Sequence, residues 1–234
     1  MVTVRRPRAP GTALQSAMPL NATLTRSSVR LLEEADGSFL RDGYCLLRDL
    51  VPKELLAAAR QRVCVMMEEQ PDWAVQWQIL DPSRATNGKG EPLPIGIQGP
   101  ASREAVFDRV ARHPSLEAVA SSLLGGPVTM ATDQLIVKHG FIHEEQGGAS
   151  FYHQDSFYWH LEPGTGLNAW LPLDDVGPNN IGLVIKPGSH LDWQLLPHEK
   201  YTDQPKWGHM KGGTFESFDR LRIPAATIDF SDVR

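Results

Sequence analysis

Three short extended runs in the second half of the chain decide the predicted fold. Residues 128–138 read Val-Thr-Met-Ala-Thr-Asp-Gln-Leu-Ile-Val-Lys, residues 166–173 read Gly-Leu-Asn-Ala-Trp-Leu-Pro-Leu, and residues 181–185 read Ile-Gly-Leu-Val-Ile. Apolar residues dominate each run, and Gly, Pro and Asn separate one run from the next, as is typical of short strands. The second half of the chain is therefore predicted to be all-β.

The first half carries helical patterns instead. Behind Pro52, apolar residues recur at helical spacing from Leu55 to Met67, and Pro is favoured at the first position of a helix. A second helical stretch covers residues 106–123 and is followed by Gly125 and Gly126, which favour a helix end. Two helical regions are thus expected before the strands begin.

Other parts of the first half have weaker patterns. A short helix is expected from about residue 28 to residue 35, and residues 43–48 are expected to form a buried strand. Residues 70–100 hold neither period and are expected to form a long loop. Loops of that length are often functional, so a lid is one interpretation, and irregular packing around Trp73 and Trp77 is the other.

This order of elements predicts the fold class. Helices first and strands afterwards, without alternation of single strands and helices, favour a mainly β fold with flanking helices, a sandwich or jelly roll. Residues 1–27 contain Pro and Gly and are expected to be a flexible segment, with an organellar leader as the alternative because arginines occur there without acids. Residues 28–234 are expected to form a single domain.

Composition excludes some classes of protein. The chain has 234 residues, a formal net charge of −5, 41% hydrophobic residues and only two cysteines. The acidic balance argues against a nucleic-acid partner and favours a small-molecule substrate. Cys45 and Cys64 lie among apolar neighbours and are expected to be buried free thiols, and no run is long enough to span a membrane. A reducing, cytoplasmic location is expected.

His153 and Asp155 carry the candidate chemistry, in the run Tyr152-His153-Gln154-Asp155. On a strand, residues two apart project from the same face, so both side chains are expected to reach one ion. Imidazole with carboxylate is part of the ligand set of non-haem Fe(II) oxygenases, which leave positions open for co-substrate and dioxygen. Alone, the motif is weak, because a His-x-Asp pair is usually an ordinary surface pair.

The surrounding sequence strengthens this interpretation. After the pair come the aromatic cluster at residues 157–160, the strand with Trp170, and the run Lys186-Pro-Gly-Ser-His190, while residues 39–44 precede a predicted strand and helix. This succession, over about residues 38–191, resembles the phytanoyl-CoA dioxygenase family of Fe(II)- and 2-oxoglutarate-dependent oxygenases. The resemblance implies a double-stranded β-helix of cupin type, preceded by N-terminal helices.

The resemblance also implies roles for single residues. His153 and Asp155 become iron ligands, and Gln134 and Trp170 contact 2-oxoglutarate, with ascorbate as a further reductant that the family allows. A structural polar residue is the alternative for Gln134, and a core position is the alternative for Trp170. His190 is expected in a turn, not on the metal. Because Asp155 is a carboxylate where halogenating relatives have a smaller residue, hydroxylation of a C–H bond is expected rather than chlorination.

Substrate contacts are less defined. Tyr158, Trp159 and His160 are candidates to wall a small-molecule substrate, with His143, Glu144 and Glu145 near its mouth. An aromatic edge of the core and a solvated run of charges are the alternative interpretations.

The chain departs from the family pattern at its end. The third ligand of the family, a late histidine, and the arginine that binds the 2-oxoglutarate carboxylate are not evident before residue 234, so the final strands are expected to be missing. His198 and His209, and Arg220 and Arg222, are weak substitutes in apparent loops. The alternative function is a pseudoenzyme or binding module that holds no iron, and a cupin-type isomerase fits poorly.

Overall fold

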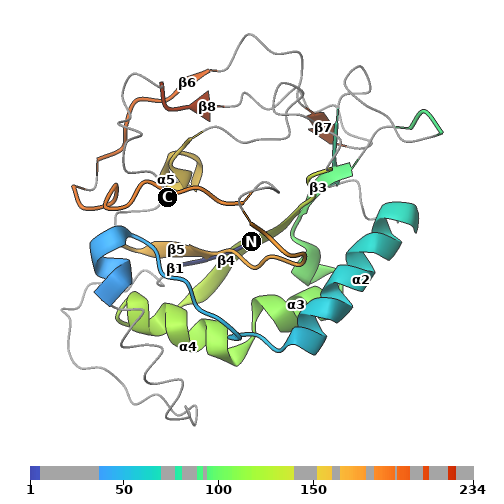
Figure 1. Ribbon diagram of the computed structural model, residues 1–234, viewed down its shortest axis with the longest axis horizontal. Helices are drawn as coiled ribbons and strands as arrows, with labels where there is room; N and C mark the ends of the chain where they lie inside the picture. Colours follow the sequence, from blue (N-terminus) through green and yellow to red (C-terminus); the bar gives the residue numbers. More distant parts are fainter. Residues whose placement is uncertain are drawn as a thin grey trace.

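The structure is a computed structural model. It describes residues 1–5, 37–69, 77–80, 89–91, 94–139, 152–159, 164–177, 182–192, 194–200, 208–210 and 221–224. Within these ranges an antiparallel six-stranded sheet forms the centre of the molecule, with the strand order β5-β1-β4-β3-β2-β7 (Figure 1). A separate two-stranded ribbon pairs β6 with β8.

The strands of the large sheet come from distant parts of the chain. Their bounds are Val2–Arg5 for β1, Trp77–Leu80 for β2, Pro94–Gln98 for β3, Thr129–Ile136 for β4, Gly166–Ala169 for β5 and Gly208–Met210 for β7. The ribbon consists of Glu199–Lys200 (β6) and Leu221–Arg222 (β8). Val2, Thr3 and Val4 are β-branched, which suits the half-buried pleated surface of a sheet.

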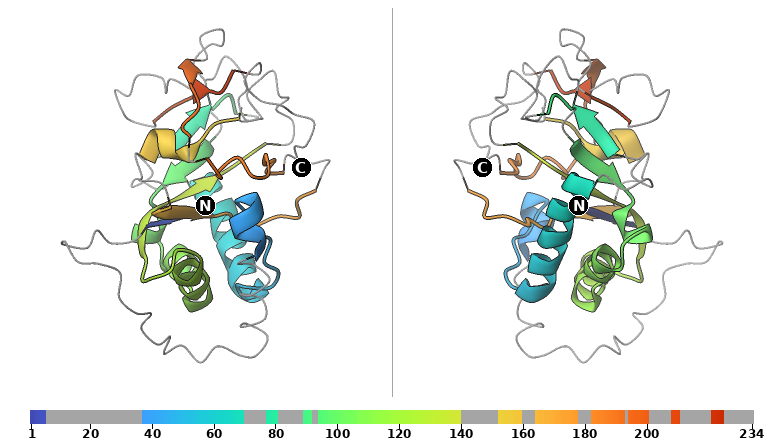
Figure 2. Two further views of the ribbon diagram at one scale, coloured as in Figure 1. Left: turned by 90° about the vertical axis from the view of Figure 1, so that its left-hand side faces the viewer. Right: turned by 90° about the vertical axis from the view of Figure 1, so that its right-hand side faces the viewer.

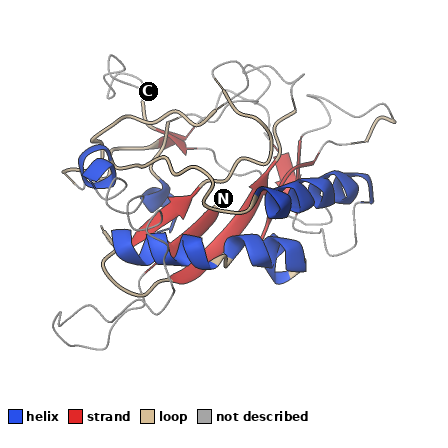
Figure 3. Cartoon of the chain, turned by 60° about the horizontal axis from the view of Figure 1, so that its bottom comes forward, coloured by secondary structure: helices blue, strands red, loops and turns tan. Residues whose placement is uncertain are grey.

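Three helices cover one face of the sheet, as Figures 2 and 3 show. They are α2 (Lys53–Glu69), α3 (Ala105–Ala111) and α4 (Pro114–Leu123), and a short 3-10 helix, η2 (Pro100–Ser102), precedes α3. Pro114 lies at the start of α4, where the ring of His113 accepts a hydrogen bond from the Ser115 N–H at 3.3 Å. Both strongly predicted helical regions are thus confirmed.

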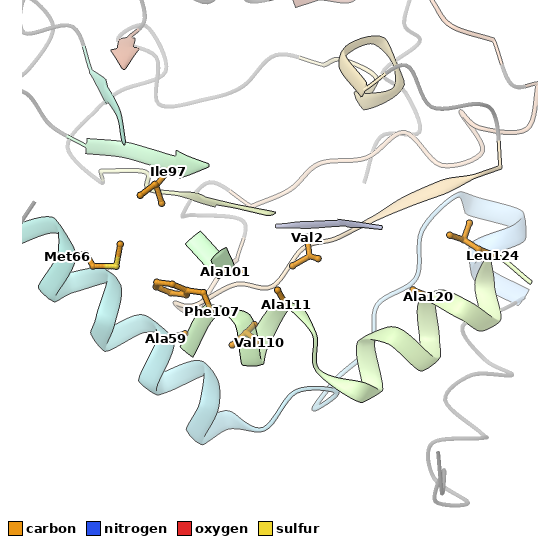
Figure 4. Close-up of a cluster of buried hydrophobic side chains, with 10 residues drawn as sticks. All are labelled: Val2, Ala59, Met66, Ile97, Ala101, Phe107, Val110, Ala111, Ala120 and Leu124. Carbon is orange, nitrogen blue, oxygen red and sulfur yellow. The ribbon is translucent and has the colours of Figure 1, made fainter. Parts of the chain in front are cut away.

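The hydrophobic core lies between these helices and the sheet. Met66 and Ala59 of α2 are fully buried, and they are seven residues apart, so they lie on one face of the helix two turns apart. In Figure 4 they face Ile97 of β3 and Phe107 of α3, while Val2 of β1 lies above Ala111. Helices α2–α4 are therefore held to the sheet by apolar packing, which includes the very first strand.

Several sequence predictions are wrong. Residues 1–5 form strand β1, although a flexible segment was expected for residues 1–27; residues 6–27 lie outside the described ranges. Strands β2 and β3 occur within the expected loop 70–100. Residues 43–48 are not a strand, and Leu46 is 74% exposed. The φ angles of Gly43 and Asp49, at the two ends of that run, are positive, and residues 43–48 pair with no strand in the described part of the chain.

Other predictions are confirmed only in part. The run 128–138 forms β4, but the run 166–173 forms a strand only up to Ala169, and residues 182–185 pair with no strand in the described chain. The residues 28–36 of the expected first helix are not described, while residues 37–42 are helical. The antiparallel sheet and its helices agree with the coarse prediction, whereas the closed jelly roll stays a prediction.

The cysteine prediction is also only partly right. Both thiols are free, but Cys64 is exposed on α2 and Cys45 is half-buried. In the described part of the chain, none of the helices combines the length and the apolar character needed to cross a bilayer.

Candidate functional site

The imidazole of His153 and the carboxylate of Asp155 meet, but not on a strand. Asp155 is the first residue of the short helix α5 (Asp155–Trp159), and residues 152–154 run into it without strand pairing. The two side chains still converge, with 3.2 Å between His153 Nε2 and Asp155 Oδ1. The strand geometry expected for this pair is therefore wrong, and the turn into α5 brings the two groups together instead.

The separation of these two atoms suits chelation. Two donors at about 2.1 Å from one ion and at a right angle to each other lie about 3.0 Å apart. Side chains of both residues are about one third exposed, so an ion in solution can reach them. The pair thus offers one nitrogen and one oxygen donor for adjacent positions on a metal.

Asn168 holds the other oxygen of the carboxylate. Its Nδ2 donates a hydrogen bond to Asp155 Oδ2, and Asn168 belongs to β5 of the large sheet. The two oxygens of Asp155 therefore face different partners: Oδ2 faces Asn168 and Oδ1 faces His153. Figure 1 shows α5 on the side of the sheet away from α2–α4, close to β5.

The residue between the two candidate ligands is fixed from the other side. The backbone N–H of Gln154 donates to His198 Nε2 at 3.0 Å. Its side-chain amide bridges residues 194–196, because Oε1 accepts from Leu196 N at 2.7 Å and Nε2 donates to Gln194 O at 2.8 Å. These bonds fasten the His153–Asp155 segment to residues 194–198.

His198 takes part in the hydrogen bonds between Gln154 and residues 194–198, called here the Gln154–His198 clamp. Since Nε2 accepts a hydrogen bond, the proton is on Nδ1, which lies 2.8 Å from the carbonyl of Leu196. The ring also stacks on Phe157, with 4.4 Å between ring centroids. Both ring nitrogens are thus engaged with the protein, and His198 acts here as a support for the segment and not as a donor to an ion.

A broad open cavity adjoins the site. Asp155, Asn168 and Trp170 line it together with exposed apolar residues such as Leu183, and its volume is about 2490 Å³. Ordinary small-molecule pockets are smaller, roughly 300–1,000 Å³. Trp170 is 39% exposed, so the core position considered as its alternative does not hold.

Gln134 lies apart from this cavity. It is in the middle of the sheet on β4, and its side-chain oxygen accepts a hydrogen bond from Gln98 of β3 at 2.7 Å. Among the described residues that line the cavity, Gln134 is absent. The structure therefore brings Asp155 and Trp170 to one cavity and places Gln134 in a polar pair between β3 and β4.

The remaining sequence candidates are only partly described. The backbone of Tyr158 and Trp159 belongs to α5, but their side chains, as well as His160, residues 143–145 and Arg220, lie outside the described part. Backbone positions alone are described for His209, on the edge strand β7, and for Arg222, on β8. Within the described ranges, histidines, cysteines and acids nowhere form a group of three or more that could hold a metal.

His190 lies where the sequence predicted, in a turn over residues 187–192. Its Nε2 is 3.0 Å from the carbonyl of Leu40, and the N–H of Gly188 donates to Asp42 O at 2.9 Å. The turn therefore anchors residues 40–42 and has a structural role.

Asn168 and the Gln154–His198 clamp were missed by sequence reasoning. Asn168 occurs in a short apolar strand and matches no motif, and the contact to Asp155 depends on tertiary structure. The one available signal was an unexplained polar residue between Leu167 and Ala169.

Comparison with known proteins defines the class. The family model of phytanoyl-CoA dioxygenase (PhyH) matches residues 39–216, more than half of the chain. The chain belongs to this family, as the His153–Asp155 motif and its flanking segments suggested. The family is named for a dioxygenase, and the two relatives described next are named as a dioxygenase and a hydroxylase.

Two curated proteins are similar to this chain in sequence. The chain is 26% identical over 204 residues to a probable phytanoyl-CoA dioxygenase of Caenorhabditis elegans, a match that covers 85% of this chain and 62% of that protein. It is 29% identical over 163 residues to L-proline trans-4-hydroxylase of Streptomyces griseoviridis, over 68% of this chain and 55% of that enzyme. The chain thus spans less than two thirds of the length of either relative. No solved structure matches it significantly.

Proposed function

We propose that the protein is an Fe(II)- and 2-oxoglutarate-dependent dioxygenase that hydroxylates a C–H bond of a small molecule. The observation that supports this most is the 3.2 Å approach of His153 Nε2 to Asp155 Oδ1, in a chain that belongs to the family. Bound iron and 2-oxoglutarate would supply the oxidising chemistry. The two residues fit two neighbouring donor positions on such an ion.

The protein's own groups would act as follows. His153 would donate through Nε2 as a neutral imidazole, and Asp155 through Oδ1. Asn168 occupies Oδ2, which favours binding through one carboxylate oxygen and leaves more of the ion's positions open for co-substrate. Trp170 is on the wall of the same cavity, where it would pack against the co-substrate or the substrate.

The substrate class is drawn from the relatives. One relative's name gives phytanoyl-CoA as a substrate and the other's gives L-proline, so a fatty acyl thioester and a free amino acid are the first two classes to test. The open cavity with exposed Leu183, Val184 and Leu195 favours a substrate with an apolar part. A fatty acyl chain fits this surface better than a small zwitterion does.

An anaerobic titration tests the proposal. Fe(II) and 2-oxoglutarate are added to the protein, and the metal-to-ligand charge-transfer band is followed. Removal of a ligand in Asp155→Ala is expected to weaken Fe(II) binding by more than the roughly 10- to 100-fold that loss of a supporting residue costs. The control is Asp174→Ala, which removes an exposed carboxylate paired with Arg60 and is expected to bind as the parent does.

The outcomes are distinct. A band in the parent and the control, with loss in Asp155→Ala, supports the proposal. A parent that shows no band and releases no succinate from 2-oxoglutarate would instead support the alternative function, a binding module without iron.

A further inference from the structure

Strand β1 lies inside the large sheet, between β5 and β4. Residues 2–5 pair antiparallel with β4 on one side and with β5 on the other. Thr3 is opposite Thr132 of β4 and opposite Asn168 of β5. Strands β4 and β5 have no direct pairing in this sheet, so β1 is the element that joins them.

Apolar packing against the helical layer also holds β1 in place. Val2 is 4% exposed and belongs to the core cluster that includes Phe107, Ala111 and Leu124 of the helical layer. Figure 4 shows its side chain directed toward the helices. The strand is therefore held by pairing on two edges and by apolar contact on one face.

The strands on either side of β1 bear residues of the candidate site. Asn168 on β5 holds Asp155 Oδ2, and Trp170 directly follows β5. Without β1, the inner edges of β4 and β5 would each present unpaired backbone N–H and C=O groups, which a sheet interior does not tolerate. β5 has only four residues and pairs with β1 alone in the described chain, so its position depends on β1.

We propose that β1 is a positioning element of the iron site: it fixes β5, β5 fixes Asn168, and Asn168 fixes the carboxylate of Asp155. This inference rests on the proposed function, because it assigns β1 and Asn168 a role in metal binding. In this view residues 2–5 are needed for the site although they are far from His153 in the sequence. Asn168 is the side chain through which the effect reaches the iron ligand.

The test uses backbone and side-chain variants of the whole chain. Thr3→Pro removes a backbone N–H inside a central strand, where proline is not tolerated, and Thr3→Ala keeps that N–H as the matched control. Asn168→Ala removes the amide that holds Asp155, and Ser156→Ala changes an exposed side chain next to Asp155 as its control. Fe(II) affinity is measured with and without 2-oxoglutarate, and hydrogen exchange is measured on β5 and on α2.

The expected results follow from the chain of contacts. Thr3→Pro should lose exchange protection on residues 166–169 while α2 stays protected, and its Fe(II) affinity should fall about 10- to 100-fold, as should that of Asn168→Ala. Both controls should behave as the parent does. Asn168→Ala should keep the protection of β5, because the change is limited to the side chain.

Several results would overturn the inference. Thr3→Pro that loses protection on β5 but keeps its Fe(II) affinity would show that β1 does not position the site. Parent-like affinity of Asn168→Ala would remove Asn168 from the path, and loss of α2 protection in Thr3→Pro would show a general folding role only. A parent protein that binds no Fe(II) would overturn the proposed function itself. The exchange data on β5 do not depend on iron, so they still test whether β1 fixes β5.

Discussion

Asp133 is a buried carboxylate whose replacement has a calculable effect. It lies on β4 with 6% of its surface exposed, and its Oδ2 accepts the Ala101 N–H at 2.8 Å. Ala101 is in the first turn of η2, where the N–H groups have no partner within the helix, and Pro100 before it has none to offer. The carboxylate therefore satisfies the backbone donor that starts this helix.

Burial raises the pKa of Asp133 above its ordinary value of 3.8, although the hydrogen bond from Ala101 and the charges of the Met1 ammonium and of Arg112 oppose this shift. A raised pKa means that the folded state holds the proton more tightly than the unfolded state does. The contribution of Asp133 to the free energy of unfolding is thus most favourable below 3.8, and it is lost as the pH rises through that value to the raised pKa.

Two variants separate the hydrogen bond from the charge. Asp133→Ala leaves the buried Ala101 N–H without its acceptor, so the free energy of unfolding should fall by about 1–3 kcal/mol. Asp133→Asn keeps a carbonyl oxygen of nearly the same size and removes the charge, so at neutral pH the change should stay within about 1 kcal/mol. Relative to the parent, the Asn variant should gain stability as the pH rises.

Urea unfolding followed by tryptophan fluorescence, from about pH 4 to about pH 7, measures these differences. The difference between the parent and Asp133→Asn reports on Asp133 together with the Met1 ammonium, because all other carboxylates are common to both proteins. Burial lowers the pKa of that ammonium to about 6, and the charge of Asp133 opposes this shift, so its titration also changes in the Asn variant. If Asp133→Asn is as unstable as Asp133→Ala, the hydrogen-bond argument is wrong. If the difference between parent and Asn variant does not change with pH, the argument from burial is wrong.

Two further predictions concern a glycine and the thiols. Gly43 has a φ of +83°, and a Cβ added there would lie 2.6 Å from His190 Nδ1. At Gly90 φ is +77°, but an added Cβ would have no atom within 4 Å. Gly43→Ala should therefore lower the stability measured by thermal unfolding more than Gly90→Ala does. The glycine conformation alone costs about 1–2 kcal/mol in both variants, and equal losses would refute a clash with His190. Burial raises the pKa of the Cys45 thiol, whereas Cys64 is exposed. Iodoacetamide should therefore label Cys64 several-fold faster than Cys45 near neutral pH, measured by peptide mass spectrometry. Faster labelling of Cys45 would contradict this prediction.

The helices were the part of the fold most open to prediction from sequence. In α2, apolar residues at helical spacing behind Pro52 form a local signal that does not depend on distant residues. Strands β2 and β3 had no such signal, because strands of four and five residues show too few alternations to be recognised. Their register with each other and with β4 is set by pairing across the sheet.

In the candidate site, too, local sequence motifs could be recognised but contacts between distant segments could not. The motif of His153 and Asp155 with its flanking segments was enough to indicate the family, and the family match agrees. The assumption that a strand carries the pair failed, because the turn into α5 depends on contacts from residues 194–198, about forty positions away. Spacing by two predicted that the side chains meet but not the backbone that makes them meet.

By itself, then, the sequence determined the helices around the core and the His-x-Asp motif of an oxygenase family, since these are local patterns within a few turns or a few residues. Only the tertiary structure decided that residues 2–5 are a central strand, that Asn168 holds Asp155 and that His198 supports Gln154. The physical reason is that a hydrogen bond between residues far apart in the chain leaves no periodic trace in either segment. Its existence depends on the sheet that brings the two together.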